Sequence, residues 1–131
     1  MISNANMIEV ASRVLRPVKV EDRIFGDVGA AVLSRSGDLF TGVCIDTHSW
    51  GLCAERSAIA AMVTAGQYEI RKVVAVWRDG SGSLRVVPPC GICREFMRSV
   101  NESNLEAEII LGLTESAILR ELLPRHEWPS Q

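Results

Sequence analysis

Two short cysteine motifs constrain this chain most, because each stands at the start of a predicted helix. The first is Cys53-Ala54-Glu55 and the second is Pro89-Cys90-Gly91-Ile92-Cys93. A helix start presents unpaired N–H groups and about half a positive charge, which favours thiolate over thiol. Thiolates at two such helix starts can converge on one cation. We therefore expect a fold that brings the two motifs together.

Hydrophobic spacing predicts the elements that carry these motifs. They are a helix at 7–15, a β-hairpin over 27–46, a helix at 53–65, a strand at 72–77, a helix at 90–100, a strand at 106–113 and a helix at 115–123. Strands that alternate with helices indicate an α/β fold with parallel neighbours in its second half. We expect a mixed sheet sandwiched by helices, in a single domain that covers residues 1–131.

Composition and charge narrow the classes of function. The 131 residues are 47% hydrophobic and 23% charged, which is ordinary for a globular domain. A formal net charge of −2 offers no basic surface for a row of phosphates, so the expected partner is a small molecule and not a nucleic acid polymer. No apolar run approaches the roughly 20 residues of a membrane span. The N-terminus lacks the pattern of a secretory signal, so we expect a cytoplasmic protein whose four cysteines stay reduced.

Cys53, Cys90 and Cys93 are the candidate zinc ligands, and Glu55 is the candidate catalytic residue. Three thiolates leave the fourth tetrahedral position for water, which is the pattern of a catalytic zinc site. Zinc lowers the pKa of such a water, and a carboxylate that is not a ligand can carry the released proton to a leaving amine. Glu55 follows Cys53 by two residues and suits that role.

Two arginines directly follow ligand positions. Three thiolates overcompensate the charge of zinc, so positive neighbours help to tune the site. We therefore hypothesise that Arg56, Arg94 or both donate hydrogen bonds to cysteine sulfurs. The alternative is that both are solvent-exposed helix arginines.

The motifs CAER and PCGICRE resemble those of the zinc-dependent cytidine deaminase superfamily. The segments VGAAVLSRSGDLFTGV and ELLP are also similar to stretches of the small cytidine deaminases, so the resemblance runs along most of the chain. It implies a three-layer α-β-α sandwich with a five-stranded mixed sheet, and a homotetramer or homodimer with active sites near subunit interfaces. An all-cysteine site is typical of free-nucleoside cytidine deaminases and blasticidin-S deaminases.

The function that this resemblance implies is hydrolytic deamination of cytidine or deoxycytidine in pyrimidine salvage, with one Zn²⁺ per subunit. The runner-up is a deaminase of blasticidin S or of another modified cytosine or aminated heterocycle. The runner-up stays open because small cytidine deaminases carry Asn-x-Glu, which binds ribose hydroxyls, where this chain has Cys44-Ile45-Asp46.

Five residues are expected to contact the substrate. Cys44 and Asp46 stand in the position of the ribose contacts, and Asp46 can still accept a hydrogen bond from a hydroxyl group. The resemblance places the backbone of Ala54 against the carbonyl of the ring. Phe25 is a candidate aromatic wall. Trp128 either stacks on the base or packs against its own domain or a neighbouring subunit.

Three alternatives to this assignment remain. A closed structural zinc site would use Cys44 as its fourth ligand. A redox function would use Cys90-Gly91-Ile92-Cys93 by itself. A third alternative is a catalytically inactive relative that acts as a binding module. His48 and His126 are interpreted as surface or packing residues, and a contact with the substrate is the alternative for each of them.

Overall fold

The computed structural model describes residues 2–129, and strand β5 (Ile70–Arg78) forms the centre of its sheet. Its apolar run is buried on both faces, as the continuous hydrophobic pattern predicts. The other elements are α1 (Asn4–Arg13), β1 (Val18–Val20), β2 (Arg23–Phe25), β3 (Val28–Ser34), β4 (Leu39–Val43), α2 (Ala54–Thr64), β6 (Leu84–Val87), α3 (Gly91–Val100), the 3₁₀ helix η1 (Glu102–Glu106), β7 (Glu108–Ile110), β8 (Ser116–Ile118) and α4 (Leu119–Leu122).

The main sheet has the strand order β4-β3-β5-β7-β8, and β6 pairs with β5 on the side where β7 also pairs. Only the β5–β7 pair is parallel among the described strands, and the chain reaches it through β6, α3 and η1. The sheet is therefore mixed, as predicted. It has six strands where the resemblance implied five, because β6 shares one side of β5 with β7.

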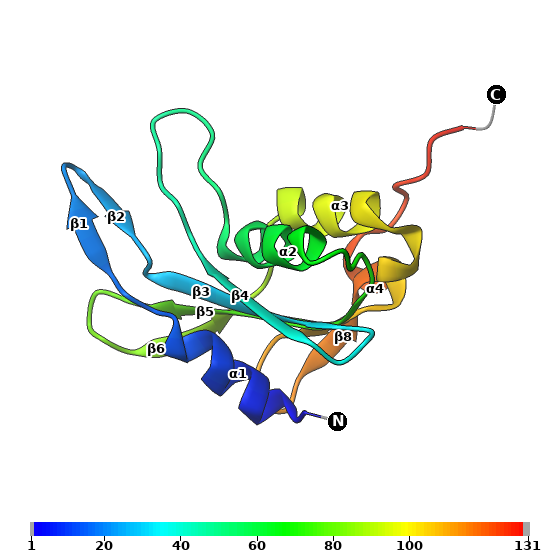
Figure 1. Ribbon diagram of the computed structural model, residues 1–131, viewed down its shortest axis with the longest axis horizontal. Coiled ribbons are helices and arrows are strands. Elements are labelled where there is room, and N and C mark those ends of the chain that lie inside the picture. Colours follow the sequence, from blue (N-terminus) through cyan, green and yellow to red (C-terminus); the bar gives the residue numbers. More distant parts are fainter. Residues whose placement is uncertain (1, 130–131) are drawn as a thin grey trace.

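Helices cover both faces of this sheet, so the predicted three-layer sandwich is confirmed (Figure 1). Alternate residues of each strand point to opposite faces, which separates two hydrophobic cores. The core under α1 contains Ala31, Leu33, Val74, Val76 and Ile110 from the sheet. The core under α2, α3 and α4 contains Ala30, Val32, Val73, Ala75 and Ile109.

Gly42 lets α2 approach strand β4 closely. A Cβ atom built at Gly42 would lie 2.5 Å from the backbone nitrogen of Ala58 and 2.7 Å from the side chain of Ser57. Contacts this short are not sterically possible, so a larger residue would push the helix away from the sheet. The first turn of α2, which carries Cys53 and Glu55, thus depends on this close packing for its position.

The structure departs from the predicted elements in several places. Residues 84–87, for which no element was predicted, form β6 and pair with β5. Residues 18–25 form a hairpin that projects from the body, with Glu21 in the left-handed region at φ 58°. Residues 116–118, which were predicted as part of a helix at 115–123, instead form β8 and pair with β7, so α4 has only four residues. None of the helices within residues 2–129 has the length and hydropathy of a membrane-spanning segment.

Candidate active site

The three candidate ligands converge at the N-termini of α2 and α3. Cys53 is the N-cap of α2 and Cys90 is the N-cap of α3, and neither side chain makes a capping hydrogen bond. Cys93 lies in the first turn of α3, so the Cys-x-x-Cys spacing puts both of its sulfurs at one helix end. Strand β6 runs antiparallel to β5 and ends at Val87, which pairs with Ala75. The chain then continues to Cys90, whose sulfur lies beside that of Cys53 at the start of α2.

The distances between the sulfurs fit a tetrahedral zinc ion. The Sγ atoms of Cys53 and Cys90 are 3.6 Å apart, those of Cys90 and Cys93 are 3.5 Å apart, and all three lie within 4.8 Å of one another. Zinc–sulfur bonds of about 2.3 Å at tetrahedral angles separate two sulfurs by about 3.8 Å. All three cysteines are free thiols. The group can therefore hold one metal ion through three sulfur atoms.

The surroundings of Cys90 and Cys93 shift the pKa values of their thiols in opposite directions. Burial opposes ionisation of Cys90, but backbone N–H groups at the helix start and the neighbouring thiols outweigh it and lower its pKa. Burial, followed by the charge of Glu55 and contact with Cys90, raises the pKa of Cys93. Metal binding favours the thiolate form of every ligand and releases protons. A bound divalent cation would therefore stabilise all three sulfurs as thiolates.

Glu55 is held in the first turn of α2 with only 4% of its surface exposed. Burial raises the pKa of this carboxyl above its usual value, although the charge of Arg56 acts in the opposite direction. Glu55 borders a small space together with Val87 and Pro89, and its charge acts on the thiol of Cys93. A carboxyl with a raised pKa beside a metal centre is suited to both accept and donate a proton.

The two arginines make different contacts. The guanidinium of Arg56 lies 3.6 Å from the sulfur of Cys53 and donates to the carbonyl of Gly51 at 3.3 Å. The guanidinium of Arg94 donates instead to the carbonyls of Pro89, at 2.9 Å, and Leu122, at 3.1 Å. Only Arg56 is therefore placed to donate to a cysteine sulfur, while Arg94 connects the start of α3 to the end of α4.

A cleft of about 540 Å³ adjoins Cys53, and it is lined by both residues predicted to replace the ribose contacts, Cys44 and Asp46. Cys44 is not part of the three-sulfur group, because its thiol donates a hydrogen bond to the carboxylate of Asp27 at 3.2 Å. Asp27, which was not among the residues selected from the sequence, also lines this cleft. No motif marks it, since its role depends on the pairing of β3 with β4.

A family model described as the cytidine and deoxycytidylate deaminase zinc-binding region matches residues 3–106 of the chain. This span contains the three sulfurs and Glu55. The chain belongs to this deaminase family. It is therefore a zinc-dependent enzyme of the class that hydrolyses carbon–nitrogen bonds.

Curated relatives of this deaminase carry two kinds of name. A cytidine deaminase of Halalkalibacterium halodurans is 32% identical over 101 residues, which cover 74% of each chain. A blasticidin-S deaminase of Bacillus cereus is 33% identical over 97 residues, which cover 70% of this chain and 68% of the relative. The similarity to these two relatives is nearly equal.

Solved structures agree with the fold of this deaminase. The crystal structure of a cytidine deaminase from Mycobacterium tuberculosis has 29% sequence identity and a TM-score of 0.66, over 92% of this chain and 90% of that one. A cytidine deaminase from Burkholderia pseudomallei has a TM-score of 0.75 over 95% and 98% of the two chains, and at 24% identity this likeness shows the fold.

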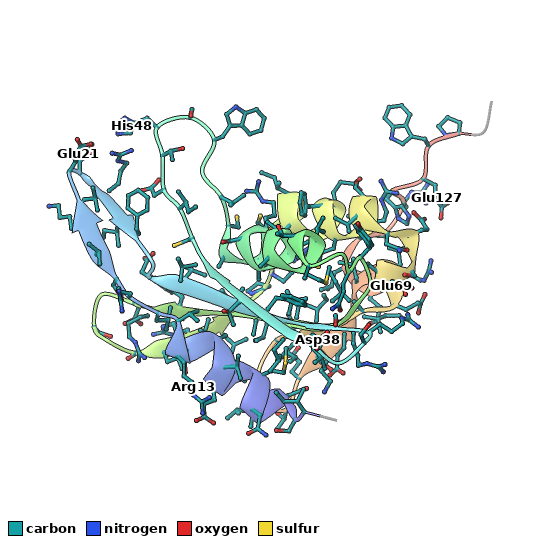
Figure 2. All side chains as sticks on the ribbon, in the orientation of Figure 1. Arg13, Glu21, Asp38, His48, Glu69 and Glu127 are labelled. Carbon is teal, nitrogen blue, oxygen red and sulfur yellow. The ribbon has the colours of Figure 1, made fainter. Side chains whose placement is uncertain are left out.

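The remaining predicted contacts of the deaminase lie away from the metal group. Phe25 ends β2 and its ring faces the guanidinium of Arg23 at 5.8 Å, while its neighbour Ile24 lines the cleft. Trp128 is 89% exposed on the C-terminal tail. Figure 2 shows its neighbour Glu127 on the opposite side of α2 and α3 from His48. Among the described residues of a single chain, those that line the cleft do not include Phe25 or Trp128. Contacts of these two side chains with the substrate stay predictions.

The two histidines occupy different surroundings. His48 is exposed at the tip of the loop between β4 and α2, where its Nε2 lies 3.4 Å from Asp22 at the tip of the β1–β2 hairpin (Figure 2). His126 is packed under the tail, with only 7% of its side chain exposed, and its Nδ1 lies 3.0 Å from the carbonyl of Leu123. Both positions agree with the interpretation as surface and packing residues.

Proposed function

We propose that this deaminase hydrolyses the exocyclic amine of a free cytosine nucleoside, cytidine or deoxycytidine, to give the uracil form and ammonia. Cys53, Cys90 and Cys93 hold the zinc, and Glu55 moves the protons. The observation that carries the proposal is the convergence of three sulfurs within 4.8 Å beside a buried carboxylate that lies two residues from one of them. The name of the Halalkalibacterium halodurans relative supports the choice of substrate.

Glu55 performs the proton transfers in this reaction. Zinc, when bound by the three sulfurs, supplies Lewis-acid activation of water at neutral pH. The Glu55 carboxylate takes a proton from the attacking water and delivers it to the ring nitrogen beside the reacting carbon. It then takes the remaining proton of the added hydroxyl and transfers it to the amine nitrogen, so that the carbon–nitrogen bond breaks, the carbonyl forms and ammonia leaves. Burial raises the pKa of Glu55, which helps the side chain to hold a proton between these transfers. The backbone of Ala54, at the first position of α2, faces the carbonyl of the ring.

Arg56 tunes the sulfur group. Its guanidinium lies 3.6 Å from the Cys53 sulfur and draws negative charge from it. The same side chain donates to the carbonyl of Gly51, which fixes the loop that leads into Cys53. The Arg56 side chain therefore both positions the Cys53 sulfur and reduces its negative charge.

A modified cytosine such as blasticidin S is the second candidate substrate. The nearly equal identity of the Bacillus cereus blasticidin-S deaminase supports it. The thiol of Cys44 in the cleft supports it as well, because a thiol is a weak donor and a weak acceptor for sugar hydroxyls.

An ammonia-release assay across cytosine, cytidine, deoxycytidine, cytidine 5′-monophosphate and blasticidin S distinguishes these substrates. Zinc-loaded protein is measured, with the Glu55→Gln variant as the blank. We expect cytidine or deoxycytidine to give the largest kcat/KM. A largest kcat/KM for blasticidin S would select the second candidate. Absence of ammonia release from every cytosine compound would refute the proposed function.

The chain acts as a single domain, in a homotetramer or alternatively a homodimer, and serves pyrimidine salvage in the cytoplasm. The exposed apolar side chains of Val18, Val20 and Ile24 on the β1–β2 hairpin support assembly, because apolar surface of this kind is commonly covered by a partner. Light scattering coupled to size-exclusion chromatography measures the assembly. A monomer at micromolar concentration would contradict it.

A further inference from the structure

Cys44 and Asp27 form a fixed pair in the wall of the cleft that adjoins the metal group. The thiol of Cys44 donates to Oδ1 of Asp27 at 3.2 Å. Backbone hydrogen bonds hold both residues in place: Cys44 donates to the carbonyl of Val28 at 3.0 Å, and the carbonyl of Asp27 accepts from Arg78 at 2.9 Å. The pair therefore sits at the ends of strands β4 and β3 and not on a free loop.

Hydrogen-bond acceptors predominate in this pair. Burial raises the pKa of the Cys44 thiol, so the group stays protonated and supplies the hydrogen bond to the carboxylate. A carboxylate has two oxygens and about four lone-pair sites, and the thiol uses one of them. The remaining capacity of Asp27 lies in the cleft. A group that binds strongly there must be a donor, such as a hydroxyl.

The charge of the residues that line the cleft also favours a hydrogen-bond donor over an anionic group. Three carboxylates line it, those of Asp22, Asp27 and Asp46. Among the described residues, no lysine, arginine or histidine is part of its lining. The carboxylate of Asp22 lies 3.8 Å from the guanidinium of Arg23 and 3.4 Å from Nε2 of His48. In the part of the chain that the structure describes, Asp27 and Asp46 form no ion pair, so a phosphate group beside them would meet like charge, which disfavours binding. The cleft therefore suits an uncharged group that donates hydrogen bonds.

We propose that Asp27, held in position by Cys44, is a specificity-determining residue that accepts a hydrogen bond from the 2′- or 3′-hydroxyl of the substrate's sugar. This inference rests on the proposed function, because it places a cytosine nucleoside in the cleft beside Cys53. Asp27 sets which nucleoside is used and does not move the proton in the reaction.

The test compares three substrates in the wild-type protein and in two matched variants. The substrates are cytidine, 2′,3′-dideoxycytidine, which lacks the two hydroxyls, and cytidine 5′-monophosphate. The variants are Asp27→Ala and Asp38→Ala. They remove the same side chain and the same charge at opposite ends of the β3–β4 hairpin, and Asp38 does not line the cleft.

Asp27→Ala is expected to reduce the preference for cytidine over 2′,3′-dideoxycytidine, measured as the ratio of kcat/KM values, by about tenfold or more, because hydrogen bonds to charged groups have effects of that size. The kcat/KM for 2′,3′-dideoxycytidine should change little, and that for cytidine 5′-monophosphate should rise relative to cytidine. Asp38→Ala should leave all three ratios as in the wild type. Zinc content and melting temperature are measured for each variant, because a merely structural role would move these quantities and not the ratios.

A ratio of cytidine to 2′,3′-dideoxycytidine that stays within about twofold of wild type in folded, zinc-loaded Asp27→Ala overturns the inference and leaves the proposed function intact. Failure of the wild-type protein to release ammonia from these three substrates and from deoxycytidine refutes the proposed function, and the inference with it. If Asp27→Ala does not fold, Cys44→Val and Cys44→Ser replace it. Cys44→Val removes the donor to Asp27 and should lower the ratio, whereas Cys44→Ser keeps a donor and should preserve it, and equal ratios in these two variants overturn the inference.

Discussion

The sulfur atoms of Cys53 and Cys90 lie 3.6 Å apart although the two residues are 37 positions apart along the chain. Each is the N-cap of a helix, and each leaves its sulfur free of a capping hydrogen bond. An N-cap side chain normally accepts from the helix backbone, as that of Ser3 does at α1. Here the position that would cap the helix instead presents a metal ligand.

Replacing each cysteine in turn separates a three-ligand zinc site from a four-ligand one. Cys53→Ala and Cys90→Ala should each reduce the zinc content from about one ion per chain to near zero after dialysis against a weak chelator, because two sulfurs hold zinc poorly. Cys44→Ser should keep the full zinc content, since the thiol of Cys44 donates to Asp27. Zinc is measured by atomic emission. Loss of zinc from Cys44→Ser would favour the closed structural site.

Arg56 and Arg94 are expected to differ in what they support. Arg56→Ala should weaken zinc binding or lower kcat by about 10- to 100-fold, because its guanidinium lies against the Cys53 sulfur. Arg94→Ala should mainly reduce the free energy of unfolding, by about 1–3 kcal/mol, because it leaves the carbonyls of Pro89 and Leu122 without their donor. Chelator competition and chemical unfolding measure the two effects. Equal effects of both variants on zinc affinity would contradict the distinction.

Gly42→Ala tests how the packing of α2 positions the site. The added Cβ would lie 2.5 Å from the backbone nitrogen of Ala58, so α2 must shift, at a cost of about 1–3 kcal/mol in the free energy of unfolding. Because Cys53 and Glu55 begin this helix, kcat should fall as well. Gly80→Ala is the matched control, since a Cβ there meets no atom within 4 Å. A Gly42→Ala variant as stable and as active as Gly80→Ala would show that the close approach is not required.

Asn104 is expected to be essential for stability. Its buried side chain accepts from the backbone of Ile70 at 2.8 Å and donates to the carbonyls of Met97, at 2.9 Å, and Tyr68, at 3.2 Å. Asn104→Leu leaves these buried backbone groups unsatisfied and should lower the free energy of unfolding by about 2–4 kcal/mol. Chemical unfolding measures this change. Asn101→Ala is a useful comparison, because that residue caps η1 at the surface and should cost about 1 kcal/mol.

The sequence predicts those parts of the site that depend on local spacing. Cys-x-x-Cys puts Cys90 and Cys93 at the N-cap and in the first turn of one helix, and Cys53-Ala54-Glu55 fixes Glu55 in the first turn of another. These spacings determine side-chain directions without knowledge of the rest of the fold. The layers and the mixed sheet follow from the alternation of strands with helices.

The features that sequence analysis missed depend on tertiary pairing. The β1–β2 ribbon turns at Glu21, which adopts a left-handed conformation without the Gly or Asn that usually marks such a turn. Residues 116–118 have helix-forming neighbours, but pairing with β7 outweighs that local preference. The contact between Cys44 and Asp27 joins two strands and has no local signature.

The most direct test of the central claim is the rate of ammonia release from cytidine by zinc-loaded Glu55→Gln and wild-type protein, with zinc content measured on the same samples. Glutamine keeps the size of the side chain but cannot carry a proton, and general acid–base catalysis contributes about 10²- to 10⁴-fold. We predict about one zinc per chain in both proteins and a rate for Glu55→Gln at least about 100-fold below that of the wild type. A zinc-loaded Glu55→Gln variant that deaminates cytidine at the wild-type rate would contradict the account.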